Sequence, residues 1–102
     1  MSLYSVYVVE CCDGSLYTGI AIDVERRLSE HESGRRGAKY LRNRAPLVLK
    51  FSAAVGDRGA ALRVEARIKR LSRQAKLDLI AGRRSLASLT CEYQVPVDTS
   101  PA

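Results

Sequence analysis

The chain has 102 residues, of which 46% are apolar, enough for one domain with a small core and too few for a second domain. Seventeen lysines and arginines against eleven acidic residues leave a formal net charge of +6, which favours polyanionic partners such as nucleic acid. The longest apolar run, Val6–Val9, is far too short to cross a bilayer, and no secretion signal is recognisable. We therefore expect a cytoplasmic protein that makes no membrane contact.

The three cysteines argue against two common kinds of site. Cys11 and Cys12 are adjacent and Cys91 stands apart, so the count is odd and no Cys-x-x-Cys pair is present. Neither a disulfide framework nor a thiolate zinc site is indicated. We expect all three to be reduced packing residues.

Two short runs rich in β-branched and aromatic residues begin the chain, at residues 3–11 and 15–20. They flank the turn-forming pair Asp13-Gly14. This pattern predicts a β-hairpin.

The length of the hairpin loop decides how two tyrosines are oriented. A two-residue loop would place Tyr7 and Tyr17 on opposite faces of the sheet. A three-residue loop with Gly14 in the left-handed region would pair Tyr7 with Gly19 and turn both tyrosines to one face. We predict the three-residue loop, because of the two simplest registers only this one brings the tyrosines together.

The next segment predicts an amphipathic helix from an N-cap at Asp23 to about Ser33. One face of this helix carries side chains at the spacing i, i+3, i+4 and i+7, namely Val24, Arg27, Leu28 and His31. Arg27 and His31 therefore lie at the rim of an apolar stripe or point into a polar cleft. The alternative is an arginine that extends to water and an ordinary histidine near the helix end.

A strongly basic segment follows at residues 35–44. Its cationic side chains are Arg35, Arg36, Lys39, Arg42 and Arg44. Such a segment is either a solvated loop or a flexible clamp on the phosphates of a nucleic acid. We treat these five residues as candidate nucleic-acid-binding residues.

The second half of the chain predicts a third strand and two further helices. The strand is expected at Leu47–Ala54, and Asp57 is a good N-cap for a helix that ends near Leu71. Another helix is expected at Ser72–Ala81, closed by Gly82. We place one domain at residues 1–82 and expect residues 83–102 to form a mostly mobile tail.

Glu65 falls on the apolar stripe of the second predicted helix, beside Ala61, Val64 and Ile68. A carboxylate in that position is costly unless a cation or hydrogen-bond donors meet it. Glu65 is therefore a better functional candidate than a solvent-facing acid. The alternative is an internal salt bridge to an arginine.

The segments Val6-Tyr7-Val8 and Leu16-Tyr17-Thr18-Gly19, followed by Arg27, His31 and Glu65, resemble the GIY-YIG nuclease superfamily. The small stand-alone bacterial members, the YhbQ-like proteins, are closest in length. The resemblance implies an α/β fold with a small three-stranded antiparallel sheet flanked by helices.

The resemblance also implies an activity, which is the metal-dependent cleavage of DNA phosphodiesters by an endonuclease of DNA repair or structured-DNA processing. It assigns catalytic roles to Tyr7, Tyr17, Arg27, His31 and Glu65. Glu65 is the implied metal ligand, and the implied cofactor is Mg²⁺ or Mn²⁺. The general base stays open among both tyrosines and the histidine, and the oligomeric state is not predicted. The alternatives are a non-catalytic nucleic-acid-binding module on the same fold and a protein-interaction domain.

Overall fold

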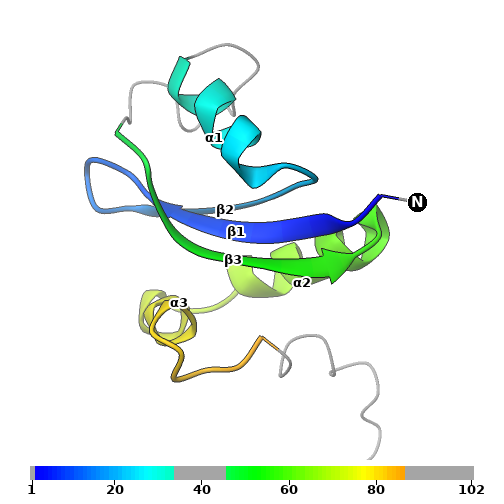
Figure 1. Cartoon of the computed structure of the whole chain (residues 1–102). Helices are drawn as coiled ribbons and strands as arrows, with labels where there is room; N and C mark the ends of the chain where they lie inside the picture. Colours follow the sequence, from blue (N-terminus) through cyan, green and yellow to red (C-terminus); the bar gives the residue numbers. More distant parts are fainter. Residues whose placement is uncertain (1, 34–45, 87–102) are drawn as a thin grey trace, which may run out of the picture.

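The computed structural model describes residues 2–33 and 46–86 and shows an α/β domain (Figure 1). Its elements are, in chain order, β1 (Tyr4–Glu10), β2 (Leu16–Ala21), α1 (Val24–Ser33), β3 (Val48–Gly56), α2 (Arg58–Lys69) and α3 (Arg73–Ile80). The strands form one antiparallel sheet in the order β2-β1-β3. Helix α1 covers one face of the sheet, and α2 and α3 cover the other (Figure 1). The predicted fold class is confirmed.

Some residues named above lie outside the part of the chain that the structure describes. They are Arg35, Arg36, Lys39, Arg42, Arg44 and Cys91. Within residues 2–33 and 46–86, no helix is both long and apolar enough to span a membrane.

The hairpin loop has the three-residue form that we predicted. The Cys11 amide donates to the Ser15 carbonyl at 2.8 Å, and the Gly14 amide donates to the Cys11 carbonyl at 2.9 Å. Gly14 has a φ of 86°, a conformation that glycine adopts without steric cost. The loop therefore sets the register of the strands that follow it.

In this register, Tyr7 lies opposite Gly19 and Val9 lies opposite Tyr17. Side chains at alternate positions of a strand point to the same face, and cross-strand partners share that face. Tyr7 and Tyr17 share one face, as predicted, and the structure shows that α1 covers this face.

The three helices begin at residues whose side chains accept a hydrogen bond from the first turn. Asp23 accepts from the amide of Arg26 at 3.1 Å, and Asp57 and Ser72 do the same at the starts of α2 and α3. The boundaries differ slightly from those predicted, because β3 continues to Gly56 and α2 ends at Lys69. Such caps fix where each helix face points.

The main apolar core lies between the sheet and α2 and α3, and it contains Val6, Val8, Val64, Ile68 and Leu79. The central strand β1 has a helix layer on both sides, which explains its unbroken run of buried residues. Leu86, which we assigned to the tail, packs against this core.

Of the two cysteines that the structure describes, Cys11 is buried as expected. Cys12 is exposed, and its expected packing role is wrong. It is the first residue of the hairpin loop, where a side chain projects away from the sheet.

Candidate active site

Tyr7 and His31 form a buried polar pair between the sheet and α1. The Tyr7 hydroxyl lies 2.9 Å from Nε2 of His31, and the two residues are 1% and 3% exposed. They come from the central strand and from the last turn of α1, which are 24 residues apart in the sequence. His31 is therefore not an ordinary helix-end histidine.

Tyr17 completes an aromatic cluster around His31. The ring of Tyr17 meets the imidazole nearly edge-on, with the ring centroids 5.9 Å apart and the planes inclined by 75°. Val24 and Leu28 of α1 pack on the same side of the sheet. The predicted stripe of α1 thus packs against the sheet and places the His31 side chain beside the two tyrosines.

Gly19 is needed where the Tyr7 ring crosses β2. A Cβ atom at Gly19 would lie 2.5 Å from the Tyr7 hydroxyl oxygen and 2.7 Å from Cζ, closer than real side chains allow. We did not assign Gly19 to the site from the sequence. The signal was available, because the predicted register already placed Gly19 opposite Tyr7.

The hydroxyl of Tyr7 stays protonated at neutral pH. Burial, and then the neighbouring Tyr17, raise the pKa of Tyr7 to about 12, while the charge and hydrogen bonding of Arg27 act in the opposite direction. Glu65 contributes to the raised pKa as well, so its charge reaches the hydroxyl through space. A phenolate at Tyr7 is therefore strongly disfavoured in the free protein.

The imidazole of His31 is neutral under the same conditions. Burial, and next the Arg27 guanidinium, lower the pKa of His31 below its usual 6.5, and Glu30 partly opposes them. A neutral imidazole has one ring nitrogen that can accept a proton. The buried pair therefore consists of a proton donor beside a proton acceptor.

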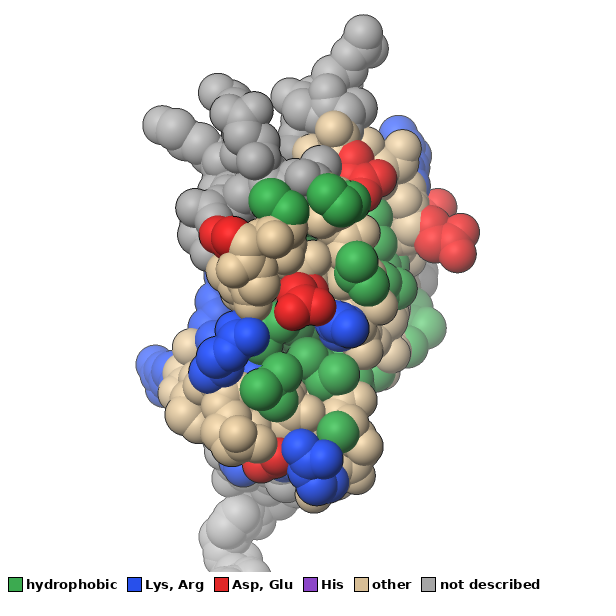
Figure 2. Space-filling model, turned by 90° about the vertical axis from the view of Figure 1, so that its left-hand side faces the viewer, with side chains coloured by type: hydrophobic (Ala, Val, Ile, Leu, Met, Phe, Trp, Pro, Cys, Tyr) green, Lys and Arg blue, Asp and Glu red, His purple; other side chains and the backbone are tan. Residues whose placement is uncertain are grey.

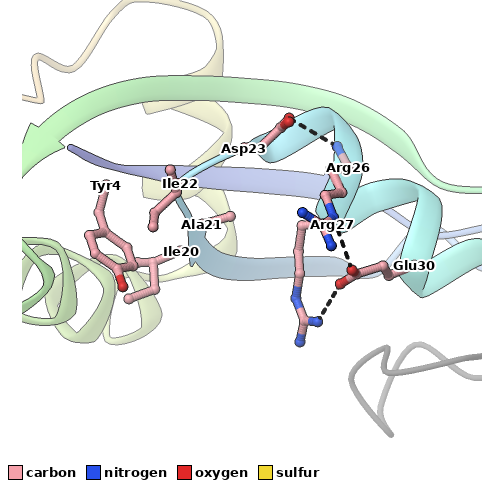
Figure 3. Close-up of a pocket in the computed structure, with 8 residues that line it drawn as sticks. All are labelled: Tyr4, Ile20, Ala21, Ile22, Asp23, Arg26, Arg27 and Glu30. Carbon is pink, nitrogen blue, oxygen red and sulfur yellow. Dashed lines mark hydrogen bonds and ion pairs between the residues drawn. The ribbon is translucent and has the colours of Figure 1, made fainter. Parts of the chain in front are cut away.

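Arg27 is held by Glu30, one turn further along α1. Its Nη1 lies 3.0 Å from Oε1 of Glu30, and Arg26 reaches the other oxygen of the same carboxylate at 3.5 Å. Figure 3 shows Glu30 between the two guanidinium groups. A guanidinium has five N–H donors, so this pair leaves Arg27 able to contact further oxygens.

Of these side chains, Arg27 and Glu30 border a hollow of about 330 Å³ at the edge of the sheet (Figure 3), whereas Tyr7, Tyr17 and His31 do not line it. The residues that line it are Tyr4, Ile20, Ala21, Ile22, Asp23, Arg26, Arg27 and Glu30. Its two cations face two carboxylates, so its charge is balanced. This hollow opens beside β2, which is an edge strand of the sheet.

Glu65 comes from the other side of the sheet, on α2. Its side chain is only 16% exposed, and its Oε2 lies 3.4 Å from Nζ of Lys69. The salt bridge that we considered as an alternative is thus present with a lysine in place of an arginine. Among residues 2–33 and 46–86, no group of three or more His, Cys, Asp or Glu side chains could hold a metal ion.

One carboxylate is nevertheless compatible with Mg²⁺ or Mn²⁺. Mg²⁺ keeps several water ligands and is commonly held by one or two carboxylates together with substrate phosphates. The hard oxygen donors of the half-buried Glu65 fit this role, whereas a complete protein cage for the ion is not found among the described residues.

The sequence profile of the GIY-YIG catalytic domain matches residues 3–78. The chain belongs to this family. Family membership supports a nuclease-type function, with DNA as the substrate that the domain implies. Each candidate residue from Tyr7 to Glu65 lies inside the matched range.

Similar proteins agree with this chain in length, and two solved structures resemble it in fold. The chain is 46% identical over 96 residues to UPF0213 protein YhbQ of Escherichia coli O139:H28 and of Shigella boydii serotype 18, covering 94% of this chain and 95% of each relative. A solved UPF0213 protein from Bacillus halodurans matches at 39% identity and a TM-score of 0.52, over 90% of this chain and 97% of that one. A solved protein from E. faecalis matches at 36% identity and a TM-score of 0.57, over 81% and 88%. None of these names describes an activity.

Proposed function

We propose that this GIY-YIG protein is a cytoplasmic, divalent-metal-dependent endonuclease that hydrolyses DNA phosphodiesters in repair or in the processing of structured DNA. The observation that carries the proposal is the buried pair of Tyr7 and His31, joined at 2.9 Å with Arg27 beside it. Phosphodiester hydrolysis needs an acceptor for the proton of the attacking water and a cation for the charge that develops on phosphate. These three side chains supply both.

In the proposed proton path, Tyr7 acts as a relay and His31 as the final acceptor. The water O–H bond breaks as the Tyr7 oxygen takes that proton, and the original Tyr7 O–H bond breaks as its proton moves to Nε2 of His31. A Tyr7 pKa of about 12 makes a free phenolate a poor starting point at neutral pH. The relay avoids that species, and the lowered pKa of His31 keeps the imidazole ready to accept.

Arg27 is proposed to bind the oxygens of the scissile phosphate. A guanidinium can approach two phosphate oxygens with parallel N–H donors, and its charge becomes more valuable as the phosphate gains negative charge. The ion pair with Glu30 fixes the side chain before substrate arrives. Tyr17 supports the site by packing against the imidazole of His31.

Glu65 is proposed to hold Mg²⁺ or Mn²⁺ at the edge of β2. When bound, the ion would supply a Lewis acid for a phosphate oxygen and for the leaving oxygen. The carboxylate itself orients this cation and adds no proton transfer.

The basic segment outside the described residues is proposed to bind phosphates along the DNA. Replacing Arg35, Arg36 and Lys39 with neutral residues is expected to weaken DNA binding and to flatten its salt dependence, since each phosphate contact releases counterions. The slope of log Kd against log salt measures this effect. An unchanged slope would favour the alternative interpretation, in which the segment is a solvated loop that does not bind phosphates.

The proposed activity is tested by incubating the protein with end-labelled DNA substrates that are linear, nicked, flapped or branched. We expect cleavage in Mg²⁺ or Mn²⁺ and none in EDTA. Retention of DNA without cleavage in either metal would favour a non-catalytic binding module. A protein that neither binds nor cuts DNA would overturn the proposal.

A further inference from the structure

A second hollow, of about 350 Å³, lies along the edge of β2 at the end opposite to Arg27. Its walls come from β2, α2 and α3, and they are formed by Leu16, Tyr17, Thr18, Lys69 and Lys76. Tyr17 belongs both to this hollow and to the aromatic cluster around His31. The second hollow is therefore directly adjacent to the candidate active site.

The two hollows differ in charge. Two arginines face two carboxylates in the hollow beside Arg27, whereas the lining of the second hollow contains Lys69 and Lys76 and, among the described residues, no carboxylate. On the face shown in Figure 2, lysine and arginine side chains gather in the lower half, on the side of the sheet that holds α3. The second hollow is therefore the better match for an anion.

Thr18 adds a polar group to the same wall. It is 3% exposed, and within the described residues its hydroxyl has no hydrogen-bond partner. Buried hydroxyls usually have a partner, so one that lines a basic hollow indicates a ligand that accepts hydrogen bonds. A phosphate oxygen is such an acceptor.

We propose that this hollow binds a backbone phosphate of the DNA next to the phosphate that is cleaved, with Lys69 and Lys76 supplying the charge. The inference rests on the proposed nuclease function and extends it, since it names where the flanking strand is held. Leu16 offers an apolar wall on which a sugar can lie. The strand would then run along the open edge of β2.

Lys69 also pairs with Glu65, the proposed metal ligand, at 3.4 Å. Its side chain is 53% exposed, and an ion pair with so exposed a partner is weak. A phosphate in the hollow competes for the same ammonium group and draws it from the carboxylate. Binding of DNA then frees Glu65 for the metal, so the two binding events are coupled.

The first test measures binding of a fluorescein-labelled DNA duplex by anisotropy in EDTA, where no cleavage occurs, over a series of salt concentrations. Lys76→Gln is expected to lower the slope of log Kd against log salt by about 0.9, the value for one lost phosphate contact on duplex DNA. Lys76→Arg keeps the charge and is expected to keep the slope. Arg58→Gln is the matched control, because it removes one exposed charge at the opposite end of α2.

A slope for Lys76→Gln equal to that of Arg58→Gln would overturn the inference. Circular dichroism of each variant shows whether it is folded. If the wild type neither binds nor cuts DNA, the proposed function itself fails. If the wild type binds and cuts while Lys76→Gln behaves like the control, the phosphate site alone fails.

The second test measures Mn²⁺ binding without DNA by electron paramagnetic resonance. Lys69→Gln removes a positive charge beside Glu65 and is expected to tighten Mn²⁺ binding by roughly thirtyfold, the effect of one unit charge on a divalent cation about 4 Å away in water. Lys76→Gln is expected to bind Mn²⁺ like the wild type. Equal Mn²⁺ affinity of Lys69→Gln and wild type would overturn the coupling between DNA and metal.

Discussion

The face of the sheet under α1 and the face under α2 and α3 bury side chains of different kinds. Beneath α2 and α3 the buried hydrophobic cluster is aliphatic and includes Val8 and Ile68, and the buried polar Thr18 lies opposite Val8. Beneath α1, a phenol and an imidazole are buried together at Tyr7 and His31. Because alternate residues of β1 point to opposite faces, one strand serves both regions.

The difference shows how a small domain can bury a reactive pair. Each large aliphatic side chain buried on the α2 face contributes about 1.5–3 kcal/mol, whereas a buried hydrogen bond such as that between Tyr7 and His31 contributes a net ~1 kcal/mol. The cluster beneath α2 and α3 therefore contributes mainly apolar burial, whereas the proposed proton transfer uses the face beneath α1. Glu65 brings a further candidate functional group from the side of α2.

The largest expected effect concerns Glu65. Glu65→Gln is expected to reduce cleavage in Mg²⁺ by about 10³-fold, because the proposed metal loses its carboxylate, and to leave DNA affinity nearly unchanged. Cleavage rates and anisotropy measure the two quantities. Arg27→Ala is expected to fold and also to lose cleavage.

Glu10→Gln is the matched control for Glu65→Gln. Glu10 is likewise paired with a lysine, Lys50, at 3.5 Å, but it lies on β1 and we assign it no metal-binding role. We expect it to cleave at the wild-type rate. Wild-type cleavage by Glu65→Gln would show that Glu65 is a structural ion-pair partner. Glu65 would then no longer be a candidate metal ligand on the side of α2.

A smaller loss is expected from the reactive pair itself. Tyr7→Phe keeps the ring but removes the relay hydroxyl, so cleavage is expected to fall by about 10²–10³-fold. Stability is expected to fall by about 1 kcal/mol, because His31 loses its partner. Urea unfolding and single-turnover cleavage measure these effects. A fully active Tyr7→Phe would exclude the proposed relay.

Substitutions at Gly19 and Gly14 distinguish two reasons for a glycine, which are lack of space for a side chain and a positive φ. Gly19→Ala places a Cβ against the Tyr7 ring, which we expect to cost about 1–3 kcal/mol in stability and up to ~10²-fold in cleavage. Gly14→Ala strains a residue with a φ of 86° but meets no atom within 4 Å. It is expected to lose stability by a comparable amount while keeping the cleavage rate. Equal cleavage by the two folded variants would argue against the close approach of Tyr7 and Gly19.

The smallest expected effect is a pH dependence that belongs to the α1 face. The pKa of His31 is lowered on folding by burial and by Arg27, so the unfolded chain binds a proton more readily than the folded protein. The stability that comes from the neutral His31 is fully present above pH 6.5, and it is lost as the pH falls through the lower pKa that His31 has in the folded state. Urea unfolding from pH 4.5 to 8 measures it. His31→Gln should flatten that part of the profile, and an identical profile would assign the acid sensitivity to other groups.

Local patterns in the sequence were sufficient for the elements, their caps and the hairpin register. The turn residues Asp13 and Gly14 allowed two simple loops, and the three-residue loop was predicted because it turns Tyr7 and Tyr17 to one face, which the structure confirms. Helical periodicity likewise placed Arg27 and His31 on one face of α1. These features depend on neighbours in the chain, so the sequence by itself determined them.

Distances between elements depend on how α1 and α2 pack, and these were decided by the tertiary structure. The 2.9 Å contact of Tyr7 with His31 joins residues 24 apart, and the lowered pKa of His31 depends on burial that no local pattern encodes. The hollow shared by Lys69 and Lys76 forms only where α2 and α3 meet the edge of β2. The pair of Glu65 with Lys69, four residues further along the same helix, is by contrast a local contact. Periodicity gives the direction of a side chain, whereas packing of the helices on the sheet sets its neighbours.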